Sequence, residues 1–97
     1  MTTEVLHYNE IIQGLNTLPN WTYHDGHLCR KWVFSDFKQA MGFILQIAFL
    51  AEAHDHHPHL VNVYNRVEIK LRTHQPDGIT QRDFALAHAI QLHSNPA

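Results

Sequence analysis

The segment AEAHDHHPHL, residues 51–60, brings four histidines and two acids together directly after a long apolar run. An imidazole can donate or accept a proton near neutral pH, because its reference pKa is about 6.5. Glu52 and Asp55 fall at the end of the helix that this run predicts, where the helix dipole disfavours an anion by about 0.3–1 kcal/mol. The segment indicates either a tuned acid–base site or exposed, flexible carboxylates whose position at the helix end lowers the stability by almost nothing.

A metal site is the alternative chemistry for the histidines of this segment. The sequence has no H-E-x-x-H motif, no pair of cysteines and no second compact group of ligands at the spacing of a structural zinc site. His54, His56, His57 and His59 span a helix end and a proline-bounded loop, so we expect their side chains to diverge. The sequence therefore predicts no physiological metal ion.

Nucleophilic catalysis has less support. The single cysteine, Cys29, falls inside a predicted strand with no histidine assigned beside it, which is typical of a buried structural thiol. A lone cysteine also excludes an internal disulfide and fits a reducing compartment. No glycine-rich phosphate loop is present.

The composition is that of one globular domain spanning residues 1–97, with 44% hydrophobic and 16% charged residues. Seven basic against nine acidic residues leave no basic field, so direct nucleic-acid binding is not expected. The longest apolar run, residues 40–51, contains Gln46 and is too short to span a bilayer. The N-terminal residues lack the basic start and apolar segment of a secretory signal, so we expect a cytoplasmic protein with no membrane partner.

Hydrophobic periodicity predicts a first helix capped by Thr3 and stopped before Pro19. Its apolar stripe comprises Tyr8, Ile11, Ile12 and Leu15. A hairpin follows, in which Asp25-Gly26 suits a two-residue type I′ turn. Pairing across that turn places five large apolar side chains on one face, with Arg30 as the exception: Trp21, Tyr23, Leu28, Trp32 and Phe34.

A second helix is predicted from Ser35-Asp36 to about Ala53. Six residues form one apolar side: Phe37, Ala40, Met41, Ile44, Leu45 and Ala48. Three more, Phe43, Ile47 and Leu50, extend the apolar surface almost around the helix. Such a helix must bury more than one face, either as the central helix of the domain or, as we expect, also against a second subunit.

Pro58 ends the helix before the histidine loop, and a second hairpin and a third helix follow. Val67, Ile69 and Leu71 alternate with charged residues, which predicts a strand with one dry and one solvated face. A turn at Asn65-Arg66 would put Val61 and Val63 on the charged side, so the register stays open.

The residues HQPDG predict a turn, and Thr80 can cap the last helix, whose Phe84, Ala87 and Ile90 face inward. Asp83 falls three residues after Thr80, where a carboxylate completes a capping box, and His74 taken alone is a surface histidine. The predicted architecture is α+β: a four-stranded antiparallel sheet with three helices on one face, in the order α-ββ-α-ββ-α.

These residues carry a resemblance to a known family. Glu52, the pair His56-His57, Pro58, Tyr64, His74 and Asp83, at these separations, resemble the signature of the pterin-4a-carbinolamine dehydratases. The segments NVYNRVEIKLRTH and GITQRDFALA are also similar to the second hairpin and last helix of that family, and the resemblance covers about residues 20–92. One departure is Leu60, since relatives often carry an aromatic residue there.

The resemblance implies dehydration of 4a-hydroxytetrahydrobiopterin to quinonoid dihydrobiopterin during tetrahydrobiopterin recycling, a reaction without metal or redox cofactor. His56 and His74 would be general acids approaching the C4a hydroxyl from opposite sides, and His57 would orient the pterin ring and share the proton transfer. Glu52 would hold an imidazole in its useful tautomer or raise its basicity, Asp83 would support His74 or the helix cap near it, and Pro58 would bind or support the substrate.

The resemblance also implies a homodimer or homotetramer formed through sheet edges and the helix at 36–53. The alternative is a non-catalytic protein-interaction module on the same fold, similar to the dimerisation cofactors known among animal members.

Overall fold

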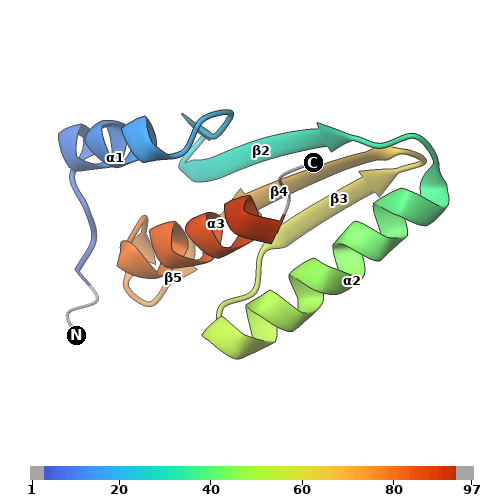
Figure 1. Ribbon diagram of the computed structural model, residues 1–97. Helices are drawn as coiled ribbons and strands as arrows, with labels where there is room; N and C mark the ends of the chain where they lie inside the picture. The colour runs from blue at the N-terminus through green and yellow to red at the C-terminus, as the bar shows by residue number, and fades with distance from the viewer. Residues whose placement is uncertain (1–3, 94–97) are drawn as a thin grey trace.

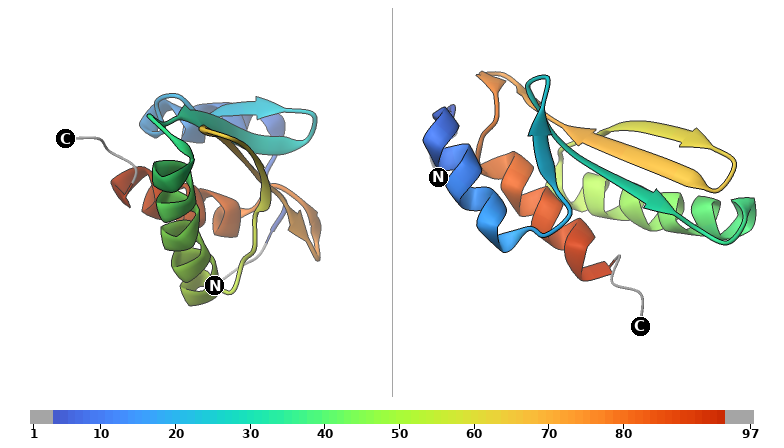
Figure 2. Two further views of the ribbon diagram at one scale, coloured as in Figure 1. Left: turned by 90° about the vertical axis from the view of Figure 1, so that its right-hand side faces the viewer. Right: turned by 90° about the horizontal axis from the view of Figure 1, so that it is seen from above.

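Our computed structural model describes residues 4–93 of the chain. These residues form a four-stranded antiparallel sheet that packs against helices (Figure 1). The strand order is β1-β2-β4-β3, with β1 at Thr22–His24, β2 at His27–Val33, β3 at His59–Val63 and β4 at Arg66–Leu71. The helices are α1 (Tyr8–Gly14), α2 (Phe37–His54) and α3 (Gln81–His93). Figure 2 shows α1 beside α3, while α2 runs along the sheet. The predicted α+β fold is confirmed.

The first hairpin has the predicted turn. Asp25 and Gly26 both have positive φ, at 52° and 77°, and His24 pairs with His27 across them, as a type I′ turn requires. Arg30, the exception on the core face, has its guanidinium 4.6 Å from the centre of the Trp32 ring and donates to the side chain of Gln91. The charge is therefore accommodated by a cation–π contact and a hydrogen bond.

Helix α2 begins as predicted, because the Asp36 carboxylate accepts a hydrogen bond of 2.8 Å from the backbone N–H of Gln39. It has two apolar faces. The buried one comprises Ala40, Phe43, Ile47 and Ala51. The predicted apolar side is divided between the two, because Ala40 is buried whereas four of its members are exposed: Phe37, Met41, Leu45 and Ala48.

The second hairpin turns one residue earlier than Asn65-Arg66. Val63 pairs with Arg66 and Val61 with Glu68, so both valines lie on the solvated face. Asn65 fixes this turn against the end of β2 through two hydrogen bonds to Phe34. The side-chain amide of Asn65 donates to the backbone carbonyl of Phe34 at 2.9 Å, and the backbone carbonyl of Asn65 accepts from the N–H of Phe34 at 2.8 Å. The register is therefore decided by contacts between strands.

At the chain ends the structure refines the predicted elements. The HQPDG turn forms a small hairpin of β5 (Thr73–His74) and β6 (Asp77–Gly78), and α3 buries the predicted Phe84, Ala87 and Ile90. Helix α1 starts at Tyr8, and a short 3-10 helix, η1 (Leu15–Thr17), follows it. Of the first predicted stripe only Ile11 is fully buried, and the predicted cap, Thr3, lies outside the described residues.

Gly14 shows how closely α1 approaches α3. A Cβ atom there would lie 2.7 Å from the ring of Phe84, so Gly14→Ala is expected to destabilise the domain by about 1–3 kcal/mol through overpacking. Gly42 in α2 has no neighbour within 4 Å of such a Cβ, so Gly42→Ala is expected to stabilise by about 0.4–1 kcal/mol. Urea unfolding of both variants tests this contrast, and equal effects would contradict it.

Candidate active site

Three segments that are distant in sequence surround an open pocket of about 500 Å³. The loop after α2 supplies Asp55, His56 and His57. The end of β4 and the β5 hairpin supply Arg72, Thr73, His74 and Gln75, and the first turn of α3 supplies Arg82. The structure therefore brings His56, His57 and His74 to one pocket, whose volume suits a small heterocycle.

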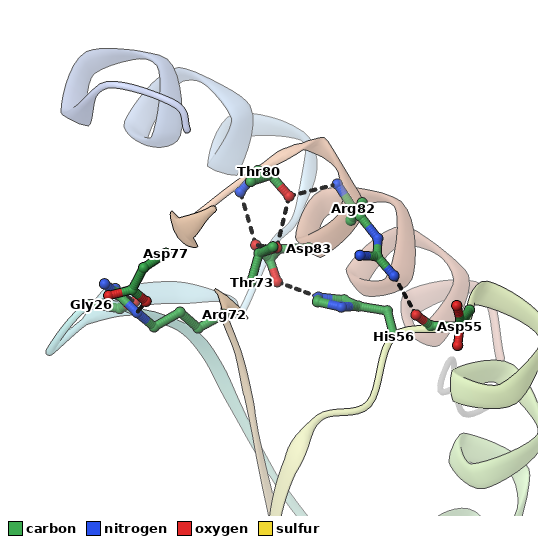
Figure 3. A network of polar contacts seen from close by, with 9 residues as sticks. All are labelled: Gly26, Asp55, His56, Arg72, Thr73, Asp77, Thr80, Arg82 and Asp83. Atoms are coloured by element: carbon green, nitrogen blue, oxygen red, sulfur yellow. Dashed lines mark hydrogen bonds and ion pairs between the residues drawn. The ribbon is translucent and has the colours of Figure 1, made fainter. Parts of the chain in front are cut away.

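The end of α2 explains how the histidine loop reaches α3. The N–H of Asp55 donates to the carbonyl of Glu52 at 3.2 Å, and the N–H of His56 donates to the carbonyl of Ala51 at 3.0 Å. With Asp55 in the left-handed region at φ 48°, these bonds form a Schellman motif. Arg82 of α3 donates to the carbonyl of Asp55 and so holds the turn against the next helix (Figure 3).

His56 and Asp83 form a buried pair at this junction. His56 is 7% exposed and Asp83 is fully buried, and their Nε2 and Oδ1 atoms lie 2.6 Å apart (Figure 3). The other carboxylate oxygen, Oδ2, accepts from the hydroxyl of Thr73 at 2.8 Å and from the backbone N–H of Thr80 at 2.9 Å. Asp83 therefore caps α3, as its position predicts, and its imidazole partner is His56 rather than His74.

His57 and Glu52 form a second pair on the open side of the loop. Their Nε2 and Oε2 atoms are 2.5 Å apart, while the side chains are 61% and 76% exposed. A pair so open to water adds at most about 1 kcal/mol to stability. The pair instead orients the His57 ring, because the carboxylate of Glu52 fixes the direction of Nε2.

The remaining predicted site residues take different places. His74 is exposed on β5 and lines the pocket, whereas Pro58 follows His57 without lining it. Leu60 pairs with Ile69 and packs against the hydrophobic core. An aromatic residue at this position would therefore extend the core contact on the dry face of the sheet.

Sequence reasoning missed Thr73 as part of the site and assigned Thr80 only to the helix cap. A signal for Thr73 was present in the alternation of the fourth strand. Val67, Ile69 and Leu71 are all buried, and the same spacing of two reaches Thr73, which is 1% exposed. A hydroxyl at a core position must have a hydrogen-bond partner, so this spacing predicts a buried polar contact at Thr73.

Cys29 is a buried free thiol in β2, outside this pocket. Burial, followed by the nearby carboxylate of Glu68, raises the pKa of the Cys29 thiol, so little nucleophilic thiolate forms at neutral pH. Across residues 4–93, no three His, Cys, Asp or Glu side chains are grouped as ligands for a metal ion. The same residues include no helix long and apolar enough to cross a membrane.

Relatives of known sequence resemble nearly the whole chain. A protein of Rhizorhabdus wittichii is 44% identical over 93 residues, which cover 94% of this chain and 96% of that protein. One from Prochlorococcus marinus strain MIT 9303 is 44% identical over 92 residues, with coverage of 95% and 96%. Both carry pterin-4-alpha-carbinolamine dehydratase as a provisional name.

Solved structures agree with this fold. The crystal structure of a Brucella melitensis protein, described as transcriptional coactivator/pterin dehydratase, superposes with a TM-score of 0.90 at 35% identity, covering 95% of this chain and all of that one. A pterin dehydratase-like protein described as a RuBisCO assembly factor of the alpha-carboxysome has a TM-score of 0.64 at 18% identity, covering 79% and 89%, and shares the fold. The model of the family described as pterin 4 alpha carbinolamine dehydratase matches residues 4–92, and the chain belongs to that family.

Proposed function

We propose that this protein dehydrates 4a-hydroxytetrahydrobiopterin to quinonoid dihydrobiopterin by histidine acid–base catalysis, as a step of tetrahydrobiopterin recycling. The observation that carries the proposal is the buried His56–Asp83 pair at the wall of a pocket that His57 and His74 also line. Membership of the family supplies the substrate class.

The reaction requires two proton movements and no exchange of electrons with a cofactor. The hydroxyl on C4a takes a proton and leaves as water, while N5 loses its proton and its electron pair forms the N5=C4a double bond. An imidazole can serve at either place, because it is partly protonated near neutral pH. Three imidazoles around one pocket therefore supply both an acid and a base.

The positions of the histidines suggest a division of roles. His56, oriented by Asp83, and His74, from the opposite segment of the rim, act on the C4a hydroxyl and the N5 proton. His57, held by Glu52, orients the pterin ring and can share the proton transfer. Pro58 fixes the backbone that follows His57.

Turnover of 4a-hydroxytetrahydropterin in a stopped assay tests this function. We expect His57→Ala and His74→Ala each to lower the rate by at least about tenfold, at the lower end of what acid–base groups contribute. His54→Ala is the matched control, since His54 is an exposed histidine at the end of α2 outside the pocket lining. Equal rates for wild type and both pocket variants would remove the proposal.

The same proposal includes assembly into a homodimer or homotetramer and a cytoplasmic location. The exposed face of α2 supports assembly, because Leu45 and Phe49 are 60% and 70% exposed beside Phe37 and Met41. Strands β1 and β3 are the edges of the sheet, where a second sheet could pair. A single buried thiol suits a reducing compartment.

Leu45→Asp is expected to dissociate the oligomer, because a carboxylate would be desolvated at the interface. Light scattering after size exclusion measures the change in mass. Leu92→Asp is the matched control, since Leu92 is 81% exposed on α3, and we expect it to leave the mass unchanged. An unchanged mass for Leu45→Asp would exclude this face of α2 as the interface.

A non-catalytic interaction module is the second candidate. The exposed apolar face of α2 favours it, as does the description of the Brucella melitensis structure as a transcriptional coactivator as well as a pterin dehydratase. It predicts an intact oligomer that lacks turnover, so the same assay separates the two functions.

A further inference from the structure

We propose that Thr73 and Thr80 are positioning residues that hold Asp83 so that His56 carries its proton on Nε2 and exchanges protons through Nδ1. This inference rests on the proposed function and assigns the reacting atom of one of its histidines. It comes from a chain of hydrogen bonds that runs from α3 through the β5 hairpin to the pocket wall (Figure 3).

The direction of every hydrogen bond in the chain follows from counting protons. Thr73, Thr80 and Asp83 are each no more than 1% exposed, so their partners are within the protein. A hydroxyl carries one proton, and Thr73 gives its own to Oδ2 of Asp83 at 2.8 Å. The 2.8 Å contact between the two hydroxyls then requires Thr80 to donate to Thr73. The Thr80 oxygen in turn accepts from the N–H of Arg82 at 3.2 Å.

The same count excludes a proton on one oxygen of Asp83, and the helix dipole favours the ionised carboxylate. Its Oδ2 accepts two hydrogen bonds, from Thr73 and from the N–H of Thr80, which leaves no place for a proton on that oxygen. Asp83 also lies in the first turn of α3, where the helix dipole stabilises an anion. An ionised carboxylate only accepts, so Oδ1 accepts from Nε2–H of His56 across 2.6 Å.

Because Nε2 of His56 donates to Asp83, only Nδ1 of the ring remains available for proton transfer. Since His56 lines the pocket, Nδ1 is the atom that can exchange a proton with a bound pterin. Without the Thr73 hydroxyl, Oδ2 would keep only the N–H of Thr80, and the orientation of the carboxylate would be less firmly fixed. The tautomer of His56 with its proton on Nδ1 would then become populated, which removes the base from the pocket.

Thr73→Val tests the assignment because valine has nearly the same shape as threonine without its hydroxyl. Nitrogen-15 NMR of the His56 ring is expected to show a single Nε2–H tautomer in wild type and in Thr73→Ser, and a mixture of tautomers in Thr73→Val. We expect kcat to fall about tenfold in Thr73→Val, as for a lost hydrogen bond to a charged group, with KM within about twofold. Thr73→Ser should restore most of this loss.

Ile79→Val is the matched control, because Ile79 is buried next to Thr80 in the chain. The substitution removes one methylene and weakens the packing, but it leaves the hydrogen bonds intact. It should leave the tautomer unchanged. Thr80→Val gives a second measurement should Thr73→Val fold poorly. It removes the hydroxyl that donates to Thr73 and accepts from the N–H of Arg82, and it keeps the N–H of Thr80 on Asp83, so it should shift the tautomer in the same direction.

A single Nε2–H tautomer in both valine variants of the threonines would overturn this inference even with full dehydratase activity. The same shift in Ile79→Val would also overturn it. Conversely, a tautomer shift in the valine variants of a protein whose wild type lacks turnover would reject the proposed function and leave the positioning intact. The two failures are therefore distinguishable.

Discussion

Replacing His56 with alanine is expected to lower kcat for pterin dehydration by about 10²- to 10⁴-fold, the range typical of a positioned acid–base group. The effect should exceed that of His57→Ala or His74→Ala, because only His56 among these three is buried and oriented by a fully buried carboxylate. KM is expected to change less, since the imidazole acts mainly in the transition state. Stopped-flow turnover under saturating substrate measures the change in kcat.

His59→Ala is the control for His56→Ala. His59 is an exposed histidine three residues further along the chain, on β3 and outside the pocket lining. It should keep the wild-type rate. A His56→Ala protein that is folded and retains more than about a third of wild-type kcat would contradict acid–base catalysis by this residue.

Replacing Asp83 with alanine is expected to lower the free energy of unfolding by about 3–5 kcal/mol. The substitution leaves the N–H of Thr80 and the hydroxyl of Thr73 without their acceptor in a region closed to water. It also removes the acceptor for His56 and the carboxylate that caps α3. For a domain whose total stability is typically about 5–15 kcal/mol, this is a large fraction.

Urea unfolding at pH 7 measures the effect of Asp83→Ala, with Asp77→Ala as the control. Asp77 accepts a hydrogen bond of 3.0 Å from Arg72 but is exposed. That hydrogen bond, then the charge of Arg72, lowers the pKa of Asp77, so its small contribution is present at pH 7 and is lost as the pH falls through the lowered pKa. The control should unfold close to wild type. A similarly small change for Asp83→Ala would show that the buried network contributes little to stability.

The sequence determined the features that depend on neighbouring residues. Asp25-Gly26 specified its turn because both residues tolerate positive φ, and Asp36 specified the start of α2 because its carboxylate accepts from the first helical turn. The alternation from Val67 to Leu71 specified a strand with one dry face, and all three apolar residues are buried there. These features combine into the α+β fold without any knowledge of distant contacts.

The sequence also predicted acid–base chemistry for three of the residues that carry the family resemblance, His56, His57 and His74, and the structure brings them to one pocket. It could not predict which carboxylate each of these histidines contacts. The sequence left the register of the second hairpin open. In the structure Tyr64 adopts a positive φ of 52° in the turn, and the contact of Asn65 with Phe34 fixes the hairpin against β2.

Only the tertiary structure decided the partner of Asp83 and the face of α2 that is buried. The left-handed Asp55 turns the chain so that His56, and not His74, reaches the first turn of α3. Thr73 gains its role only because β5 lies beside that same turn. The physical reason is that a hydrogen bond in a buried site depends on how whole elements dock, whereas a sequence pattern encodes only which way each side chain faces on its own element.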